Sequence, residues 1–139
     1  MILRPDKNFK PCASDVDDEL FPNGIFVFNI TKMLDYIGTH PEDFPIEEVP
    51  VASLGFTSQR LDEATVSKAD LTKPLLLAEI APGQFNVIDG NHRLEKARRE
   101  GATLLPVWRV GPRVHTRFLI SSESYREYVS YWNSKVRGH

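Results

Sequence analysis

The sequence predicts an α+β protein with a small mixed sheet and flanking helices. Short β-branched and aromatic runs bounded by turn residues indicate strands. A C-terminal segment with apolar residues at helical spacing indicates a helix that packs on them. The composition, 41% apolar and 26% charged, is that of an ordinary globular protein. Because the 139 residues contain no repeat or low-complexity linker, we expect one domain, 1–139.

The first third of the chain is predicted to be irregular before it becomes regular. Residues 1–23 are rich in proline and charge and have no sustained periodicity, so we expect loops or an added arm. The β-branched and aromatic stretch from Ile25 to Ile30 predicts a strand. Thr31 to Ile37 predicts a short helix that ends at Gly38, with Asn29 or Thr31 as its N-cap.

The middle of the chain predicts an edge strand followed by a hairpin. Ile46 to Leu54 is expected at a sheet edge, because Pro50 lacks the N–H that a central strand donates. A helical turn is expected from Asp62 to Lys68. The apolar segments 73–80 and 85–88, separated by a turn, then predict the two strands of a hairpin.

The last third is predicted to hold two more strands and a helix. Leu104 to Val110 predicts a strand that Gly111-Pro112 ends, and Val114 to Ile120 predicts a further strand. Ser121 or Ser122 is expected to cap the final helix. Its apolar residues fall at helical spacing and are expected to pack in the core: Tyr125, Tyr128, Val129, Trp132 and Val136.

Cysteine usage and hydropathy restrict the class of protein. The single cysteine, Cys12, excludes an internal disulfide and a cysteine-built metal site, and we interpret it as an incidental thiol. The longest apolar run, around Pro74 to Ala78, is far shorter than the ~20 residues that a membrane span needs. Met1 to Pro5 lacks the pattern of a signal peptide. We therefore expect a cytoplasmic protein with no membrane partner.

The net charge of −2 hides an uneven distribution. Residues 1–88 hold seven Lys and Arg against fourteen Asp and Glu, whereas residues 89–117 hold seven against three. A local positive segment in an acidic chain favours a small anion as ligand over broad wrapping of duplex DNA.

The positive segment begins at an abrupt strand-to-helix turn. Ile88 ends an apolar strand, Asp89-Gly90 turns the chain, and a basic helix follows from Asn91 until Gly101 stops it. The N-terminus of such a helix presents backbone N–H groups and the positive end of the helix dipole, which favour a phosphate or another anion.

The residue types at this turn suit an anion site. Gly90 permits a positive φ that lets a phosphate approach closely. His92 and Arg93 add donors, and Arg93 can hold two phosphate oxygens at once. Asp89 either holds Mg²⁺ that bridges phosphates or fixes the turn through backbone N–H groups. The alternative is a plain turn with His92 and Arg93 solvated on the surface.

The turn and its flanks resemble a known superfamily. The segment Ile88 to Arg93, continued through Ala97, Gly101 and Leu105-Pro106-Val107, is similar to the signature of the ParB/sulfiredoxin superfamily. Upstream, the segments 48–54 and 71–77 look like the first two strands of ParB-type domains, although Lys73-Pro74 replaces the more usual Gln-Pro. The resemblance covers residues 46–110, with 1–45 as an N-terminal extension and 111–139 as a C-terminal strand and helix.

The resemblance implies a nucleotide site for ATP or another NTP, with Mg²⁺. Gly90, Asn91, His92 and Arg93 would cradle the phosphates, and Thr72 and Lys73 would lie near the other end of the nucleotide. The expected catalytic residues are Asp89, His92 and Arg93, with Asp89 also the metal ligand.

The sequence differs from the superfamily pattern at positions that exclude some of its activities. Sulfiredoxins carry their catalytic cysteine where Asn91 stands, so that thiol chemistry is absent. Partitioning ParB proteins need a helix-turn-helix domain, and the segment after Val110 is too short for one. A free-amino-acid kinase branch has a histidine at the position of Asn91. The remaining resemblance is to stand-alone members of the superfamily, which are often associated with plasmids, phages or other mobile elements.

Three hypotheses follow for the activity. The first is a nucleotide-binding enzyme that, with Mg²⁺, hydrolyses NTP or uses it to cut or transfer to DNA or another substrate. Asp89 and Glu95 are the candidate bases for the attacking water. The second is a catalytically silent ParB-like binding module that acts as an inhibitor or adaptor of a protein partner. The third is a metal-dependent DNase, which would need the basic side chains to form one DNA-binding face: Lys96, Arg98, Arg99, Arg109, Arg113 and Arg117.

Overall fold

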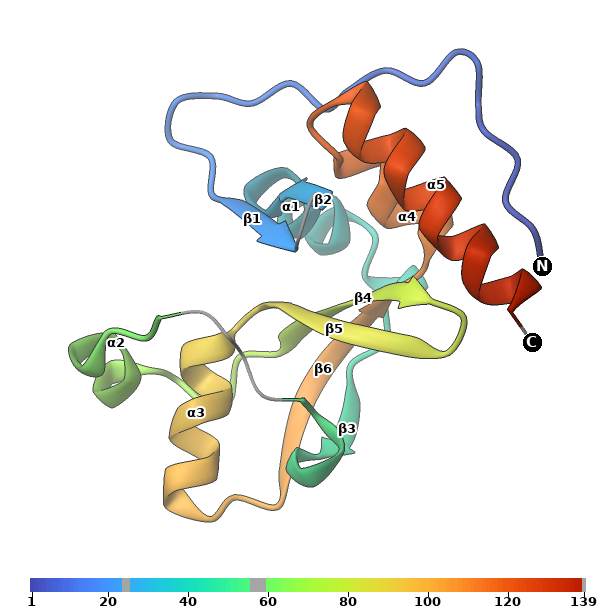
Figure 1. Ribbon diagram of the computed structural model, residues 1–139. Helices are drawn as coiled ribbons and strands as arrows, with labels where there is room; N and C mark the ends of the chain where they lie inside the picture. The colour runs from blue at the N-terminus through green and yellow to red at the C-terminus, as the bar shows by residue number, and fades with distance from the viewer. Residues whose placement is uncertain (24–25, 56–59, 139) are drawn as a thin grey trace.

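A four-stranded mixed sheet forms the centre of the protein (Figure 1). The computed structural model describes residues 1–23, 26–55 and 60–138. In spatial order the strands are β3 (Glu47–Pro50), β6 (Leu104–Val110), β4 (Leu75–Ala81) and β5 (Gln84–Asp89). β4 and β6 are parallel, and the other two pairs are antiparallel. The expected α+β class, the edge position of the strand that ends at Pro50 and the hairpin are confirmed.

The remaining elements pack on the two faces of this sheet. The helices are α1 (Ile30–Thr39), α2 (Glu63–Lys68), α3 (Asn91–Glu100), α4 (Pro112–His115) and α5 (Ser122–Arg137), with 3₁₀ turns η1 (Pro41–Asp43), η2 (Val51–Ser53) and η3 (Thr116–Phe118). A two-stranded hairpin, β1 (Leu20–Asn23) and β2 (Phe26–Asn29), forms a second sheet. Among the described helices, none has the length and apolar content that crossing a membrane requires.

The central strand β4 is buried on both faces, because alternate side chains of a strand point to opposite sides of the sheet. Leu75 and Leu77 pack with Leu94 of α3 in one hydrophobic cluster. Leu76 and Ala78 pack in a second cluster on the other face. This two-sided burial explains why the sequence of β4 is a continuous apolar run rather than an alternating one.

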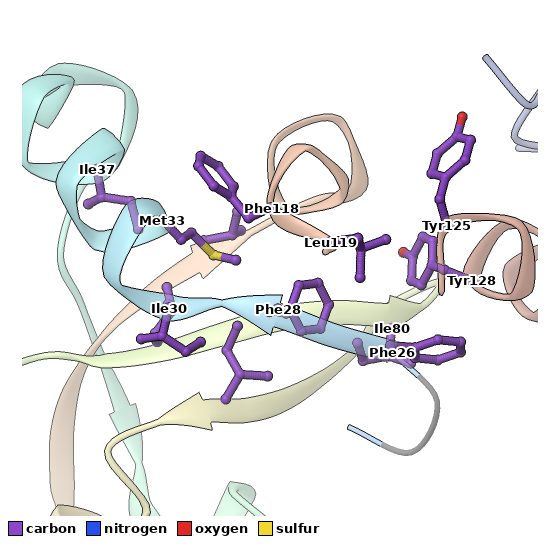
Figure 2. Packing of buried hydrophobic residues seen from close by; sticks show 14 of the residues in the cluster. Phe26, Phe28, Ile30, Met33, Ile37, Ile80, Phe118, Leu119, Tyr125 and Tyr128 are labelled. Carbon is purple, nitrogen blue, oxygen red and sulfur yellow. The ribbon is translucent and has the colours of Figure 1, made fainter. Parts of the chain in front are cut away.

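The larger cluster joins α1, α5 and the β1–β2 hairpin to the sheet. Figure 2 shows side chains from β2, α1, η3 and α5 converging between these elements and the sheet. Its largest fully buried members include Phe28, Ile30, Met33, Ile37, Leu119 and Tyr128. The apolar residues of the C-terminal helix therefore face the core as predicted, with Tyr125, Tyr128, Val129 and Trp132 buried.

The N-terminal segment is irregular as predicted as far as Glu19, but residues 20–23, expected to be irregular too, form β1 because they pair with β2. The irregular part packs along α5 rather than extending away (Figure 1). Leu3 N–H donates to Asn133 Oδ1 at 2.8 Å, and Asn133 Nδ2 donates back to Leu3 O at 2.9 Å. The Phe9 ring stacks on Tyr125 with centroids 4.0 Å apart. Residues 1–23 therefore belong to the same packed layer as α5.

Most of the sequence-based boundaries agree with the structure within a few residues. Asn29 caps α1 by accepting from Lys32 N–H at 3.0 Å, as expected, and the helix continues through Gly38. Asp62 caps α2, and Ser121 caps α5. The expected start of the second strand at Ile25 lies outside the described residues.

The expected strand from Val114 to Ile120 is wrong. The chain forms α4 and η3 there, and Leu119 makes only an isolated bridge to Phe28. Pro112 at the first helical turn favours this local helix, because its ring presets φ and its missing N–H needs no partner there. The Thr116 hydroxyl also donates to Pro112 O at 2.6 Å.

A buried histidine makes this packed layer sensitive to acid. His115 is fully buried, with its ring edge-on to Phe28 and Tyr128. His115 Nε2 lies 2.8 Å from Glu79 O, which makes Nε2–H the donor, while Nδ1 has no partner among the described residues. Burial lowers the pKa of His115 from 6.5 to about 4.

We predict that the protein loses stability as the pH falls from about 6.5 to about 4, because the unfolded chain then binds a proton that folded His115 refuses. This pKa difference corresponds to a loss of about 3 kcal/mol in the free energy of unfolding. Chemical denaturation across this range should show a shallower pH dependence for His115→Leu than for the wild type. Equal pH dependence in the two proteins would contradict the prediction.

Candidate anion-binding site

The turn between β5 and α3 requires glycine for both conformation and space. Gly90 has φ +102°, in the left-handed region, and lies directly before the first residue of α3. A Cβ atom here would collide with Cδ2 of Leu75 and would lie 3.2 Å from Cζ of Arg93. The positive φ predicted for Gly90 is therefore confirmed, and the tight packing of Leu75 and Arg93 is a second reason for glycine.

Arg93 connects the start of β4 to the end of β5. Its Nη1 donates to Lys73 O at 3.1 Å and to Pro74 O at 2.6 Å, and its Nη2 donates to Asp89 Oδ2 at 3.1 Å. Among the described residues, these bonds use three of the five N–H donors of the guanidinium. The sequence predicts a two-oxygen grip on phosphate, whereas the structure uses most of this side chain to hold the turn.

Asp89 is the carboxylate partner of this arginine. The Asp89 and Arg93 side chains are 18% and 17% exposed, so their ion pair is partly shielded from water. Of the two roles considered for Asp89, the structural one is thus present, although through Arg93 rather than through backbone N–H groups. Within the part of the chain that the structure describes, no group of three or more His, Cys, Asp or Glu side chains is placed to hold a metal ion.

A pocket of about 420 Å³ opens in front of the turn, between α2 and the first turn of α3. This volume suits a small-molecule ligand. The described lining residues are Thr65, Lys68, Ala69, Asp70, Lys73, Asp89, Gly90, His92 and Arg93. Three cationic side chains and one histidine thus meet two carboxylates at the positive end of a ten-residue helix.

The first turn of α3 also brings backbone donors to this end of the helix. The first intrahelical bond runs from Leu94 N–H to Gly90 O at 2.9 Å, so the N–H groups of residues 91–93 precede the helical pattern. The Asn91 residue is only 6% exposed and does not line the pocket. Its expected contribution to an anion is therefore limited to the backbone.

The α2 helix forms the opposite wall and is tied to α3. Asp62 N–H donates to His92 Nε2 at 3.2 Å, so this ring nitrogen is an acceptor in this arrangement. Lys96 Nζ donates to Ser67 O at 3.0 Å and to Ala69 O at 2.8 Å. These bonds hold α2 against α3 and keep the pocket between them.

The turn before β4 presents Lys73 to the pocket. Asp70 Oδ1 accepts from both Thr72 N–H, at 2.9 Å, and the Thr72 hydroxyl, at 2.6 Å. These two hydrogen bonds, with smaller contributions from Lys73 and Arg93, lower the pKa of Asp70. Lys73 lines the pocket as the sequence predicts, while Thr72 supports the turn and does not line the pocket.

Sequence reasoning missed a carboxylate from the N-terminal extension. Glu19 lies near the site, and partial burial together with the charge of Asp89 raises its pKa, with Arg93 and His92 acting in the opposite direction. Glu19 O accepts from Ile30 N–H, and Glu19 N–H donates to the Thr31 hydroxyl, both at 2.8 Å. No local pattern marks Glu19, because it reaches the turn only through the packing of β1 and α1.

The other charged residues of the basic segment are engaged in structural contacts. Glu95, a candidate base, accepts from Arg99 at 2.8 Å and does not line the pocket. Arg99 also pairs with Glu63 of α2. Arg109 pairs with Glu47 of β3 at 3.2 Å, whereas Arg117 lies over the Tyr36 ring of α1. Five of the six expected cations therefore contact different parts of the fold: Lys96, Arg98, Arg99, Arg109 and Arg117.

We predict that Gly90→Ala destabilises the protein more than Gly83→Ala does. Both glycines have positive φ, so each substitution carries a backbone strain of about 1–3 kcal/mol. Only at Gly90 would the new Cβ also meet Leu75, since Gly83 has open space around its Cβ position. Thermal or chemical denaturation of the two variants measures the difference, and equal losses would contradict the packing argument.

Comparison with known proteins gives no assignment beyond this geometry. No protein-family model matches the chain. No curated protein is a significant match to it either.

Proposed function

We propose that this chain is a ParB/sulfiredoxin-like protein that binds the phosphates of ATP or another NTP in the pocket in front of α3. The observation that carries the proposal is the convergence of Lys68, Lys73, His92 and Arg93 on the positive end of that helix. Cationic side chains and a helix N-terminus together stabilise bound phosphate.

The residues of the pocket have separate tasks in this proposal. Lys73 and Lys68 neutralise phosphate charge from the wall formed by α2 and the turn before β4. The backbone N–H groups of residues 91–93 meet the phosphate at the helix end. Arg93 holds that end in place and adds positive charge behind it.

The pocket is also compatible with Mg²⁺, which usually binds proteins through one or two carboxylates and the phosphates of its nucleotide. Asp89 is the lining carboxylate next to the helix end, and Asp70 is the second lining carboxylate. Bound Mg²⁺ would neutralise part of the charge of the phosphates.

For hydrolysis, Glu19 is the candidate base. Asp89 is paired with Arg93, and Glu95 is paired with Arg99 outside the pocket lining. Glu19 is also outside the pocket lining, but its carboxylate is coupled electrostatically to Asp89, Arg93 and His92 at the turn, and its raised pKa makes it a stronger proton acceptor for an attacking water. The developing charge on the transferred phosphoryl group would be stabilised by the lysines and the helix end.

Nucleotide binding is tested by calorimetric titration with ATP, CTP and GTP in the presence of Mg²⁺. We predict that Lys73→Ala weakens binding by about tenfold or more, because a charge-assisted contact to phosphate is lost. Lys73 is preferable to Arg93 for this test, since removal of Arg93 would also open the turn.

Lys7→Ala is the matched control, because Lys7 is exposed in the N-terminal segment and does not line the pocket. It should bind as the wild type does. Absence of binding by the wild type to all three nucleotides would refute the proposed function. Equal affinities of wild type and Lys73→Ala would place the nucleotide elsewhere on the protein.

Glu19→Gln tests the proposed base. We predict that it lowers the rate of NTP hydrolysis by about 100-fold, the usual loss of general base catalysis, and leaves nucleotide affinity unchanged. Asp17→Asn, which changes an exposed carboxylate two residues earlier and outside the pocket lining, should keep the wild-type rate. Wild-type turnover by Glu19→Gln would eliminate Glu19 as the base.

A catalytically silent binding module is the second candidate function. The pairing of Asp89 with Arg93, and of Glu95 with Arg99, favours it, because these side chains already serve the fold. Under this alternative the wild type binds nucleotide without turnover. A protein partner should also bind the Lys73→Ala variant as it binds the wild type.

A further inference from the structure

A second pocket, of about 500 Å³, lies at the other face of the sheet, between the β1–β2 hairpin, the β4–β5 hairpin and α5. It shares no described lining residue with the anion-binding pocket. Its described lining residues are Asn23, Phe26, Ile80, Asn86, Glu127, Ser130, Tyr131 and Ser134. The proposed nucleotide site gives this second pocket no role.

The walls of this pocket are aromatic and aliphatic. Phe26 and Ile80 are each only 6% exposed and belong to the larger cluster (Figure 2). The Tyr131 ring meets Phe26 edge-on with centroids 5.8 Å apart and remains 38% exposed. Lys135 Nζ lies 5.1 Å from the centroid of the Tyr131 ring, so this ring already attracts a cation.

The polar groups of the pocket include several hydrogen-bond acceptors. Asn86 Nδ2 donates to Asn23 Oδ1 at 3.2 Å, and the Ser134 hydroxyl donates to the carbonyl of Tyr131 at 2.6 Å. The Asn86 side-chain oxygen and the Glu127 carboxylate are further acceptors on the lining residues. Among the described lining residues, Glu127 is the acidic one.

From this chemistry we propose that the pocket binds an organic cation, with an ammonium or guanidinium group joined to an aromatic or aliphatic body. The body would pack against Phe26, Ile80 and Tyr131, and the cation would meet the Glu127 carboxylate. The acceptors and the aromatic faces both favour a positively charged donor. This binding site is independent of the nucleotide site.

The test compares three ligands of the same shape and different charge. Tyramine is the cation, tyrosol the neutral analogue, and 3-(4-hydroxyphenyl)propionate the anion. In NMR titrations of the full chain, tyramine should shift the amides of residues 127–134 and Asn86 in a saturable way. It should bind about tenfold more tightly than tyrosol, as a charge-assisted and cation–π contact requires.

Two variants of α5 test whether the Glu127 carboxylate causes the preference for tyramine. Glu127→Gln should abolish the preference for tyramine over tyrosol. Glu123→Gln, which changes an exposed carboxylate one turn earlier and outside the pocket lining, should keep it. N-acetylarginine amide, titrated in the same way, represents the arginine side chain of a protein partner, whereas tyramine represents a free amine. The tighter binder of the two indicates which kind of ligand the pocket takes.

Equal binding of tyramine and tyrosol would overturn the proposal. So would saturable shifts outside this pocket, no saturable shift up to millimolar tyramine, or an unchanged preference in Glu127→Gln.

Discussion

The Arg93 guanidinium holds together the turn on which the site is built. It joins the carbonyls that precede β4 to the carboxylate that ends β5, and so it fixes the two strands at the point where the chain enters α3. Gly90 makes this closure feasible, because the Leu75 and Arg93 side chains occupy the space of a Cβ. The same contacts that close the hairpin therefore aim the N-terminus of α3 at the pocket.

The two faces of β4 explain how a short chain builds two distinct regions. Leu75 and Leu77 anchor α3 and the anion-binding pocket, while Leu76 and Ala78 anchor the layer formed by α1, α5 and the β1–β2 hairpin. That second layer also affects the site, since it carries Glu19 to the turn. The N-terminal extension thus has two connections: it packs along α5 and it contributes a carboxylate near Asp89.

Sequence reasoning predicted the features that depend on local chemistry. The β4–β5 hairpin, the glycine turn and the caps at Asn29 and Ser121 follow from residue types a few positions apart. The local helix at α4 was missed because β-branched residues around Val114 match a strand pattern, whereas Gly111-Pro112 decides the conformation.

Two features of the site depend on contacts between distant segments, which spacing along the chain does not reveal. Arg93 looks like a phosphate ligand in sequence, yet its partners are carbonyls some 19 and 20 residues away. Glu19 looks like one of several acidic residues of the N-terminal segment, yet partial burial and the charge of Asp89 raise its pKa. The most direct test of the site is an NMR titration with Mg²⁺-ATP. The account predicts that the largest amide shifts fall at residues 91–93, Lys68 and Lys73; shifts confined to other parts of the chain, or none, would contradict it.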